Sequence, residues 1–399
     1  MLDLTKVAQQ MQGISQHLTQ EATASRQRLE RAATLMGQAT AMQRELMDRR
    51  QAWIDRMAFI AAEPAEPLDT RLFLETAPSQ HTVVATDGSQ IAPSHHEIAY
   101  FYLINVGRVV LHYGQNLHPL LDSLPEVFYR PEDLYISRQW GIRTEEWMGY
   151  CRTASETVAL VELVQEVQSS FTPHPLLAPP LLAMVDGSLI HWFLETLPAE
   201  ARDRILSPML VAWESLRSQR VPLVGYVSAS RSGEAINFLR LLTCPYAEPD
   251  CQTHCSAQSD RTPCQVLDPL KDTVLWGSLL EPGQRSPLWR SSARILELYG
   301  PHTIYFCYVH LGIEVARLEF PAWVAEDSNL LQTALSLTLA QVQKGYGYPV
   351  ALAEAHNQAV VRGSDRARFF ALLEQQMIRS GLKNVGTSYK EARKRGSIA

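Results

Sequence analysis

Two stretches of the chain follow one pattern: Val84-Ala-Thr-Asp87-Gly88-Ser89-Gln-Ile91 and Ala183-Met-Val-Asp186-Gly187-Ser188-Leu-Ile190. In each stretch, an apolar run typical of a buried strand ends at an aspartate, and Asp-Gly-Ser then predicts a sharp turn. Carboxylates at the tips of two strands of one sheet can converge on a divalent cation, because Mg²⁺ and Mn²⁺ prefer oxygen ligands. Asp-Gly-Ser can also occur simply because it forms turns, but its repetition after two strand-like runs favours a paired acidic site.

The composition is that of an ordinary globular protein, with 399 residues, 46% of them hydrophobic and 20% charged. This length allows one large domain with insertions, or two domains. The net charge of −6 gives no overall basic signal, so a nucleic-acid partner would need a local basic surface or metal-screened contacts. The sequence shows no signal peptide and no apolar stretch of the ~20 residues that a membrane span needs, which predicts a cytoplasmic protein.

The N-terminal region, residues 1–62, is predicted to be a helical arm. Apolar residues there follow a spacing of three and four, as one long helix or a helical hairpin would require. The arm either pairs with a second copy or packs on its own domain, and the sequence leaves both open. Glu63-Pro-Ala-Glu-Pro-Leu68 is interpreted as a linker.

From His81 onward the pattern predicts an α/β domain, a mixed sheet flanked by helices. Strand-like runs at 97–106 and 108–113 flank Gly107 and suggest a hairpin, and residues 115–143 suggest an irregular insertion. A strand that carries an aspartate and leads into a hairpin is how the ribonuclease H-like fold begins. Helices are predicted over 144–169, 199–218 and 328–344, a strand over 221–227, and a second hairpin around Gly312.

Three further residues are candidates for the site. Glu156 lies on the leucine stripe of its helix, where an acid is costly to bury unless it is paired or binds a metal; the alternative is an exposed position or a pair with Arg152. His356 lies on a predicted helix, either as a ligand or as a satisfied core residue. Tyr226 lies near the end of its strand, where packing residues are common.

Basic residues offer possible contacts to a phosphate backbone. Arg231 follows the strand of Tyr226, and the tail over residues 381–399 is basic, with Lys390, Arg393, Lys394 and Arg395. The basic tail is either a solvated chain end or a segment that contacts DNA or a partner.

Four cysteines fall within one short polar stretch, as Cys244-x6-Cys251-x3-Cys255-x8-Cys264. Four thiolates suit tetrahedral zinc or an iron–sulfur cluster, and a loop with little apolar material gains most from such a staple. The alternative is four free cysteines; His254 is a possible replacement ligand. Cys151 and Cys307 fit helix and strand patterns as core thiols.

The motifs described above, in their order along the chain, resemble those of the NurA nuclease family. The resemblance covers residues 80–380 and rests on Asp87-Gly-Ser, Glu156, Asp186-Gly-Ser-Leu, Val-Gly-Tyr226-Val and Tyr348-Pro-Val-Ala-Leu-x-x-Ala-His356. It implies a ribonuclease H-like, manganese- or magnesium-dependent DNA nuclease, with 5′–3′ exonuclease and single-strand endonuclease activity. It also implies a homodimer that works with a HerA-like hexameric ATPase in double-strand break repair.

The resemblance further assigns roles. Asp87, Glu156, Asp186 and His356 match the family's metal ligands, with Asp87 bridging two cations, and Tyr226 matches its site tyrosine. The chain departs from the family pattern in its cysteine insertion (244–264), and in Ser-Ala-Ser after Tyr226, where many members place a lysine. The phosphate contact of that lysine is therefore missing or moved to Arg231.

Other classes of function stay open. One is a catalytically silent adaptor that binds DNA or an ATPase, and another is a ribonuclease using the same site chemistry. A hydrolase with Ser89 or Ser188 as nucleophile is the weakest alternative, because neither serine lies in a G-x-S-x-G elbow.

Overall fold

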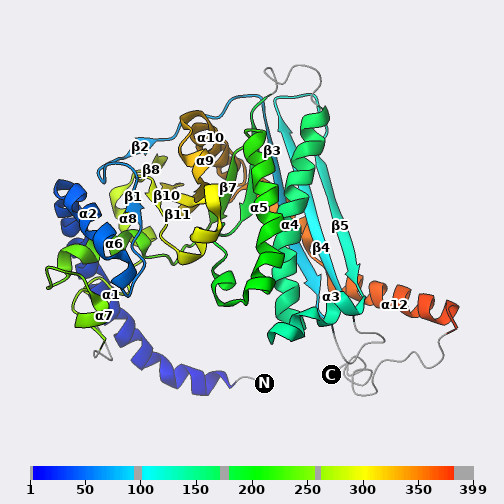
Figure 1. The fold of residues 1–399 in the computed structure, drawn as a ribbon, viewed down its shortest axis with the longest axis horizontal. Coiled ribbons are helices and arrows are strands. Elements are labelled where there is room, and N and C mark those ends of the chain that lie inside the picture. The colour runs from blue at the N-terminus through cyan, green and yellow to red at the C-terminus, as the bar shows by residue number, and fades with distance from the viewer. Residues whose placement is uncertain (1–2, 94–100, 171–178, 257–261, 382–399) are drawn as a thin grey trace. The chain divides into compact units, whose positions relative to one another are not determined.

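The structure, a computed structural model, describes residues 3–93, 101–170, 179–256 and 262–381. They form two compact units (Figure 1). The first unit combines Met1–Glu75 with Tyr226–Ala325, and the second combines Thr76–Gly225 with Glu326–Ala399.

The first unit begins with the predicted helices. Helix α1 (Leu4–Ala41) starts at Asp3, whose side chain accepts hydrogen bonds from the N–H groups of Thr5 and Lys6. Met42 interrupts the helix, and α2 (Gln43–Trp53) and the 3₁₀ turn η1 (Ile54–Arg56) follow. Only the second half of α1 joins the core of this unit, through Ala32, Leu35, Met36 and Ala39. The apolar residues of its first half are exposed, namely Leu4, Met11, Ile14 and Leu18.

An antiparallel sheet forms the other part of the first unit, with the strand order β1-β9-β10-β11 and with β8 pairing both β10 and β2. Its strands are β1 (Glu63–Pro64), β2 (Leu72–Phe73), β8 (Gln284–Arg285), β9 (Trp289–Arg290), β10 (Ile304–His310) and β11 (Val315–Pro321). Its further helices are α6 (Glu234–Thr243), α7 (Cys251–His254), α8 (Asp272–Leu279), η5 (Arg294–Leu298), η6 (Gly300–His302) and α9 (Ala322–Ala325).

Two sequence predictions are decided in this sheet. The hairpin around Gly312 is confirmed as β10–β11, and Gly312 adopts φ +95°, which favours glycine. The linker predicted over residues 63–68 is wrong at its start, because Glu63 and Pro64 pair with Arg290 and Trp289. Proline is compatible with a strand at the edge of a sheet, and β1 is such a strand.

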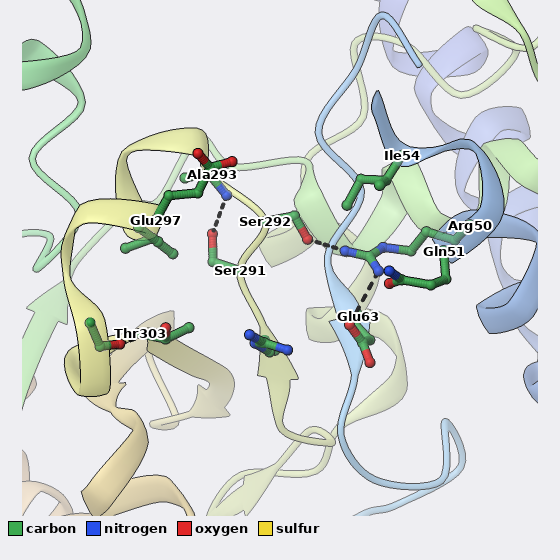
Figure 2. A pocket seen from close by; sticks show the side chains of 12 residues that line it. Arg50, Gln51, Ile54, Glu63, Ser291, Ser292, Ala293, Glu297 and Thr303 are labelled. Atoms are coloured by element: carbon green, nitrogen blue, oxygen red, sulfur yellow. Dashed lines mark hydrogen bonds and ion pairs between the residues drawn. The ribbon is translucent and has the colours of Figure 1, made fainter. Parts of the chain in front are cut away.

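Arg50 ties α2 to the strands of the first unit. Its Nε donates to the carbonyl of Ala61 at 2.8 Å, and its Nη1 lies 3.2 Å from Oε2 of Glu63. Figure 2 shows its guanidinium between Glu63 and Ser292, whose hydroxyl accepts a further hydrogen bond. The cavity beside it, of about 370 Å³, is lined by both basic and acidic side chains, so it presents no field of a single sign.

The second unit is built on a mixed sheet with the strand order β7-β6-β3-β4-β5. Strand β3 (His81–Ile91) runs parallel to β6 (Leu181–Asp186) and antiparallel to β4 (Tyr102–Tyr113), which pairs antiparallel with β5 (Leu120–Phe128). Strand β7 (Leu223–Val227) belongs to this unit as far as Gly225.

Helices flank this sheet, and α4 and α5 lie side by side over it (Figure 1). The helices of the second unit are α3 (Pro131–Tyr135), η2 (Ile136–Trp140), α4 (Thr144–Ser170), η4 (Trp192–Thr196), α5 (Ala199–Ser218), α10 (Ser328–Lys344), α11 (Val350–Ala359) and α12 (Gly363–Arg379). The predicted α/β class with a mixed sheet and flanking helices is confirmed, as are the helices predicted at α4, α5 and α10. A ribonuclease H-like topology stays a prediction.

Two predictions for the second unit are wrong. Gly107 does not separate two strands, because β4 runs through it and pairs it with Asp87 of β3. Residues 115–143 are not an irregular insertion, since they contain β5, α3 and η2. Gly107 resembles a turn signal in the sequence, but a glycine can equally mark a close backbone approach within a strand. Among the described residues, no helix is long and apolar enough to cross a membrane.

Candidate active site

The two aspartates of the repeated pattern lie on neighbouring strands. Strands β3 and β6 are parallel, and their register ends with Thr86 beside Val185, so Asp87 and Asp186 follow at the same level of the sheet. After Asp186 the chain turns as predicted: Gly187 has φ +101°, and the hydroxyl of Ser188 accepts the N–H of Ile190 at 3.0 Å. The second copy of the pattern is therefore a strand end followed by a turn.

The first copy is not a turn. Strand β3 continues through Gly88 and Ser89 to Ile91, so the predicted turn after Asp87 is wrong. A Cβ atom on Gly88 would lie 2.2 Å from Oε1 of Glu156, so a larger residue at this position would collide with that carboxyl group. Gly88 leaves the space that the carboxyl group of Glu156, on helix α4, occupies beside β3.

Successive residues of β3 face opposite sides of the sheet, and this alternation distributes the contacts. Thr86 and Gly88 face α4, since the hydroxyl of Thr86 donates to the carbonyl of Glu156 at 2.9 Å. Asp87 and Ser89 face α11 on the other side, where the Ser89 hydroxyl donates to the carbonyl of Ala359. Both helices are thus anchored to the same short segment of β3.

Helix α11 approaches the sheet closely. A Cβ atom on Gly107 would lie 2.3 Å from the carbonyl oxygen of Ala355 and 2.5 Å from the nitrogen of Ala359. The side-chain amide of Asn105 also donates to the carbonyl of Ala359, at 2.8 Å. The absence of a side chain at Gly107 and this hydrogen bond together fix the end of α11 that carries His356.

His356 contacts the first aspartate directly, with Nδ1 2.8 Å from Oδ2 of Asp87. Its side chain is 66% exposed, whereas that of Asp87 is 21% exposed. The alternative of a satisfied core histidine is therefore wrong. The other carboxylate oxygen of Asp87 accepts the N–H of Gly88 at 2.8 Å, so both oxygens of this group are held in place.

The three carboxyl groups interact electrostatically. The pKa of Glu156 is raised to about 7, chiefly by burial, and the charges of Asp87 and Asp186 contribute to this rise, whereas Arg152 and the N–H of Gly88 oppose it. Arg152 Nε lies 3.1 Å from Oε1 of Glu156, so the predicted alternative of a pair between these residues is also present. Glu156 is thus both an ion-pair partner and a member of the acidic cluster.

Tyr348 is a site residue to which the sequence assigned no role, although it begins the quoted segment that ends at His356. Burial raises the pKa of Asp186, while a hydrogen bond from the Tyr348 hydroxyl lowers it; Asp87 raises it and His356 lowers it. Tyr348 follows the glycine-rich turn between α10 and α11, in the segment Gly345-Tyr-Gly-Tyr348-Pro. A tyrosine fixed directly before the helix that carries His356 was the available signal.

These side chains fit a divalent cation by type. Carboxylate oxygens and one imidazole suit Mg²⁺ or Mn²⁺, and Oε1 of Glu156 is a buried oxygen that already faces one cationic group, the guanidinium of Arg152. No three histidine, cysteine, aspartate or glutamate side chains in the described ranges already form a metal-binding group. The donor atoms of the four residues are thus not arranged around one point, and binding a cation would require their side chains to move.

The other candidates belong to the first unit or fall outside the described residues. Tyr226 belongs to the first unit, where it is buried and its hydroxyl donates to Glu314 at 2.6 Å. Arg231, in the same unit, is exposed. The roles of both stay predictions. The basic tail with Lys390, Arg393, Lys394 and Arg395 lies outside the described residues.

The fold and the site define a class: an α/β protein with an acidic cluster and a histidine beside two parallel strands of a mixed sheet. The NurA domain model matches residues 81–361, and the chain belongs to the NurA domain family. The chain is similar in structure to the NurA nuclease from Sulfolobus solfataricus, with 12% identity, 87% of this chain and 95% of that chain covered, and a TM-score of 0.46. No curated protein matches this sequence.

Proposed function

We propose that this protein is a divalent-metal-dependent deoxyribonuclease. The observation that supports this most is that Asp87, Glu156, Asp186 and His356 gather in one unit of a chain of the NurA domain family. Like-charged carboxyl groups repel one another, so their grouping needs a compensating function. A site that binds a cation is the function that carboxylates in this arrangement perform best.

Each side chain has a distinct task in this proposal. Asp87, held by His356 and by the N–H of Gly88, would present a fixed carboxylate to the metal. Tyr348 orients Asp186, and Arg152 balances part of the charge of Glu156, which reduces repulsion within the cluster. When bound, the cation would supply Lewis-acid stabilisation of the phosphate and would lower the pKa of a coordinated water. No side chain of the chain needs to act as nucleophile.

The test is a cleavage assay on end-labelled single- and double-stranded DNA and on RNA, with and without Mn²⁺. We expect cleavage of DNA that requires the metal, and loss of detectable cleavage in Asp87→Asn. The matched control is Asp203→Asn on α5, an acid whose side chain is 67% exposed, which is expected to cut like the unchanged protein. Full activity of Asp87→Asn, or cleavage that persists after chelation, would contradict the proposed site.

The same assay separates the alternatives. Preferred cleavage of RNA would identify a ribonuclease, and binding of DNA without cleavage would identify an adaptor. The polarity of digestion, a role in break resection, a HerA-like ATPase partner and a homodimer are part of the proposal through family membership. Co-purification with such an ATPase and light scattering of the full chain test the last two.

A further inference from the structure

The cysteine-rich segment places four thiols around one point of the first unit. Cys244 caps the C-terminal end of α6, Cys251 begins the single turn of α7, Cys255 caps it, and Cys264 lies in a following turn. All four line one cavity of about 10 Å³, together with prolines, Tyr246 and Asp250 of the same segment. Residues far apart in this polar stretch therefore meet, and no disulfide joins them, because all are free cysteines.

Polar groups of the same unit face one of the four sulfur atoms. An Nη atom of Arg240 lies 3.3 Å from the Sγ atom of Cys264, which is 3% exposed, and the hydroxyl of Thr262 lies 3.6 Å from the same sulfur. Both groups can donate a hydrogen bond to this sulfur. Such a hydrogen bond to a ligand sulfur is also the usual way in which a protein orients a metal site.

The segment has few other means of staying folded. Helix α2 and η1 hold it from outside: Arg49 donates to the carbonyls of Leu241 and Tyr246, and Arg56 forms an ion pair with Asp250 at 2.6 Å. The cavity itself is lined by the four thiols, three prolines, Tyr246 and Asp250, so little aliphatic material packs around it. A metal bound by four thiolates would supply the missing crosslink inside the segment.

We propose that Cys244, Cys251, Cys255 and Cys264 bind one structural zinc ion. Four thiolates satisfy its tetrahedral shell, and the cavity volume of about 10 Å³ is close to the space of one water molecule, so it favours a single ion over a multi-iron cluster. Within the described ranges no ready-made metal-binding group is present, so the thiols must rotate inward on binding. His254 does not line the cavity; its ring stacks on Tyr246 with the ring centres 4.1 Å apart.

The test measures metal content in the full chain, purified without added zinc or chelator, by elemental mass spectrometry. We expect about one zinc per chain, retained in Cys151→Ser and lost in Cys255→Ser and in Cys264→Ser. Cys151 is the matched control because it is a half-buried thiol on α4, in the second unit. Asp87→Asn is expected to keep its zinc, so failure of this proposal and failure of the nuclease proposal are distinguishable.

A second measurement covers variants that do not fold. The unchanged protein, stripped of metal and titrated with Co²⁺, is expected to show the thiolate charge-transfer and visible bands of a tetrahedral cobalt site. Iron with acid-labile sulfide in the purified protein would overturn the zinc assignment. A folded protein that contains no zinc and shows no cobalt–thiolate bands would overturn the site itself.

Discussion

His356 Nδ1 lies 2.8 Å from Oδ2 of Asp87, and this contact joins helix α11 to strand β3. It depends on how closely the helix lies on the sheet. The face of α11 that is buried carries small residues four positions apart, Ala351, Ala355 and Ala359. On the sheet, the residue paired with Asp87 is Gly107, which lacks a side chain. His356 can therefore reach Asp87 because Gly107 has no side chain and the facing residues of α11 are small.

Gly107→Ala should separate the two residues. The new Cβ atom would lie 2.3 Å and 2.5 Å from backbone atoms of α11, and a backbone cannot move aside as a flexible side chain can. We expect a loss of unfolding free energy of about 1–3 kcal/mol, as is typical of overpacking, and a large loss of metal-dependent cleavage. Chemical denaturation and the cleavage assay measure the two effects.

The matched control for this variant is Gly149→Ala, in the interior of α4, where an added Cβ atom meets nothing within 4 Å. Alanine favours helix over glycine, so this change should stabilise the protein by about 0.5–1 kcal/mol and leave cleavage unchanged. If Gly107→Ala behaved like Gly149→Ala, the close approach of α11 would not be what positions His356.

Gly88→Ala should act on Glu156 rather than on the fold. Its Cβ atom would lie 2.2 Å from Oε1 of Glu156 and 2.8 Å from Cγ of Arg152, and both belong to flexible side chains that can move. We expect strand β3 to persist with a stability loss of about 1 kcal/mol, while the displaced carboxyl group lowers cleavage to the level of Glu156→Gln. Unchanged cleavage in Gly88→Ala would show that the carboxyl group need not occupy this place.

Tyr348→Phe should weaken metal use without removing a ligand. The variant loses the hydroxyl that donates to Asp186, and loss of a group that orients a ligand typically costs 10–100-fold in metal affinity or activity. We expect a higher Mn²⁺ concentration for half-maximal cleavage, with partial recovery at saturating metal. The control is Tyr346→Phe, since Tyr346 is 95% exposed two residues earlier. Equal metal dependence of the two variants would argue against a positioning role of Tyr348.

The sequence predicted the members of the acidic cluster better than the way they are arranged. Local periodicity identifies strands and helices, and for this reason the strands of Asp87 and Asp186 and the helix of Glu156 were found. The functions of Gly88 and Gly107 could not be found in this way. A glycine needed for a close approach looks the same in a sequence as one needed for a turn, and only the partner element, far along the chain, distinguishes them.

Long-range partners explain the other differences as well. Tyr348 affects Asp186 through a contact between separate segments of the chain, and no local pattern reveals such a contact. The pair of Arg152 and Glu156, by contrast, lies within one helix at i,i+4 spacing, and the sequence did offer it. Glu63 and Pro64 form a strand because Trp289 and Arg290 pair with them, although prolines normally indicate a linker. The pairing of β1 with β9 overrides this local preference.

His191 should make the stability of the protein depend on pH. Burial lowers the pKa of its imidazole from 6.5 to about 4, and its ring lies near those of Phe193 and Trp213. Between these values the unfolded chain binds the proton and the folded chain does not, so the free energy of unfolding falls as the pH falls through this range. The loss is at most about 3 kcal/mol. Urea denaturation at about pH 7.5 and about pH 5 measures it. In His191→Gln this part of the pH dependence should disappear, whereas His118→Gln, which changes an exposed histidine, should keep it. An unchanged pH profile in His191→Gln would show that another group is responsible for the loss at low pH.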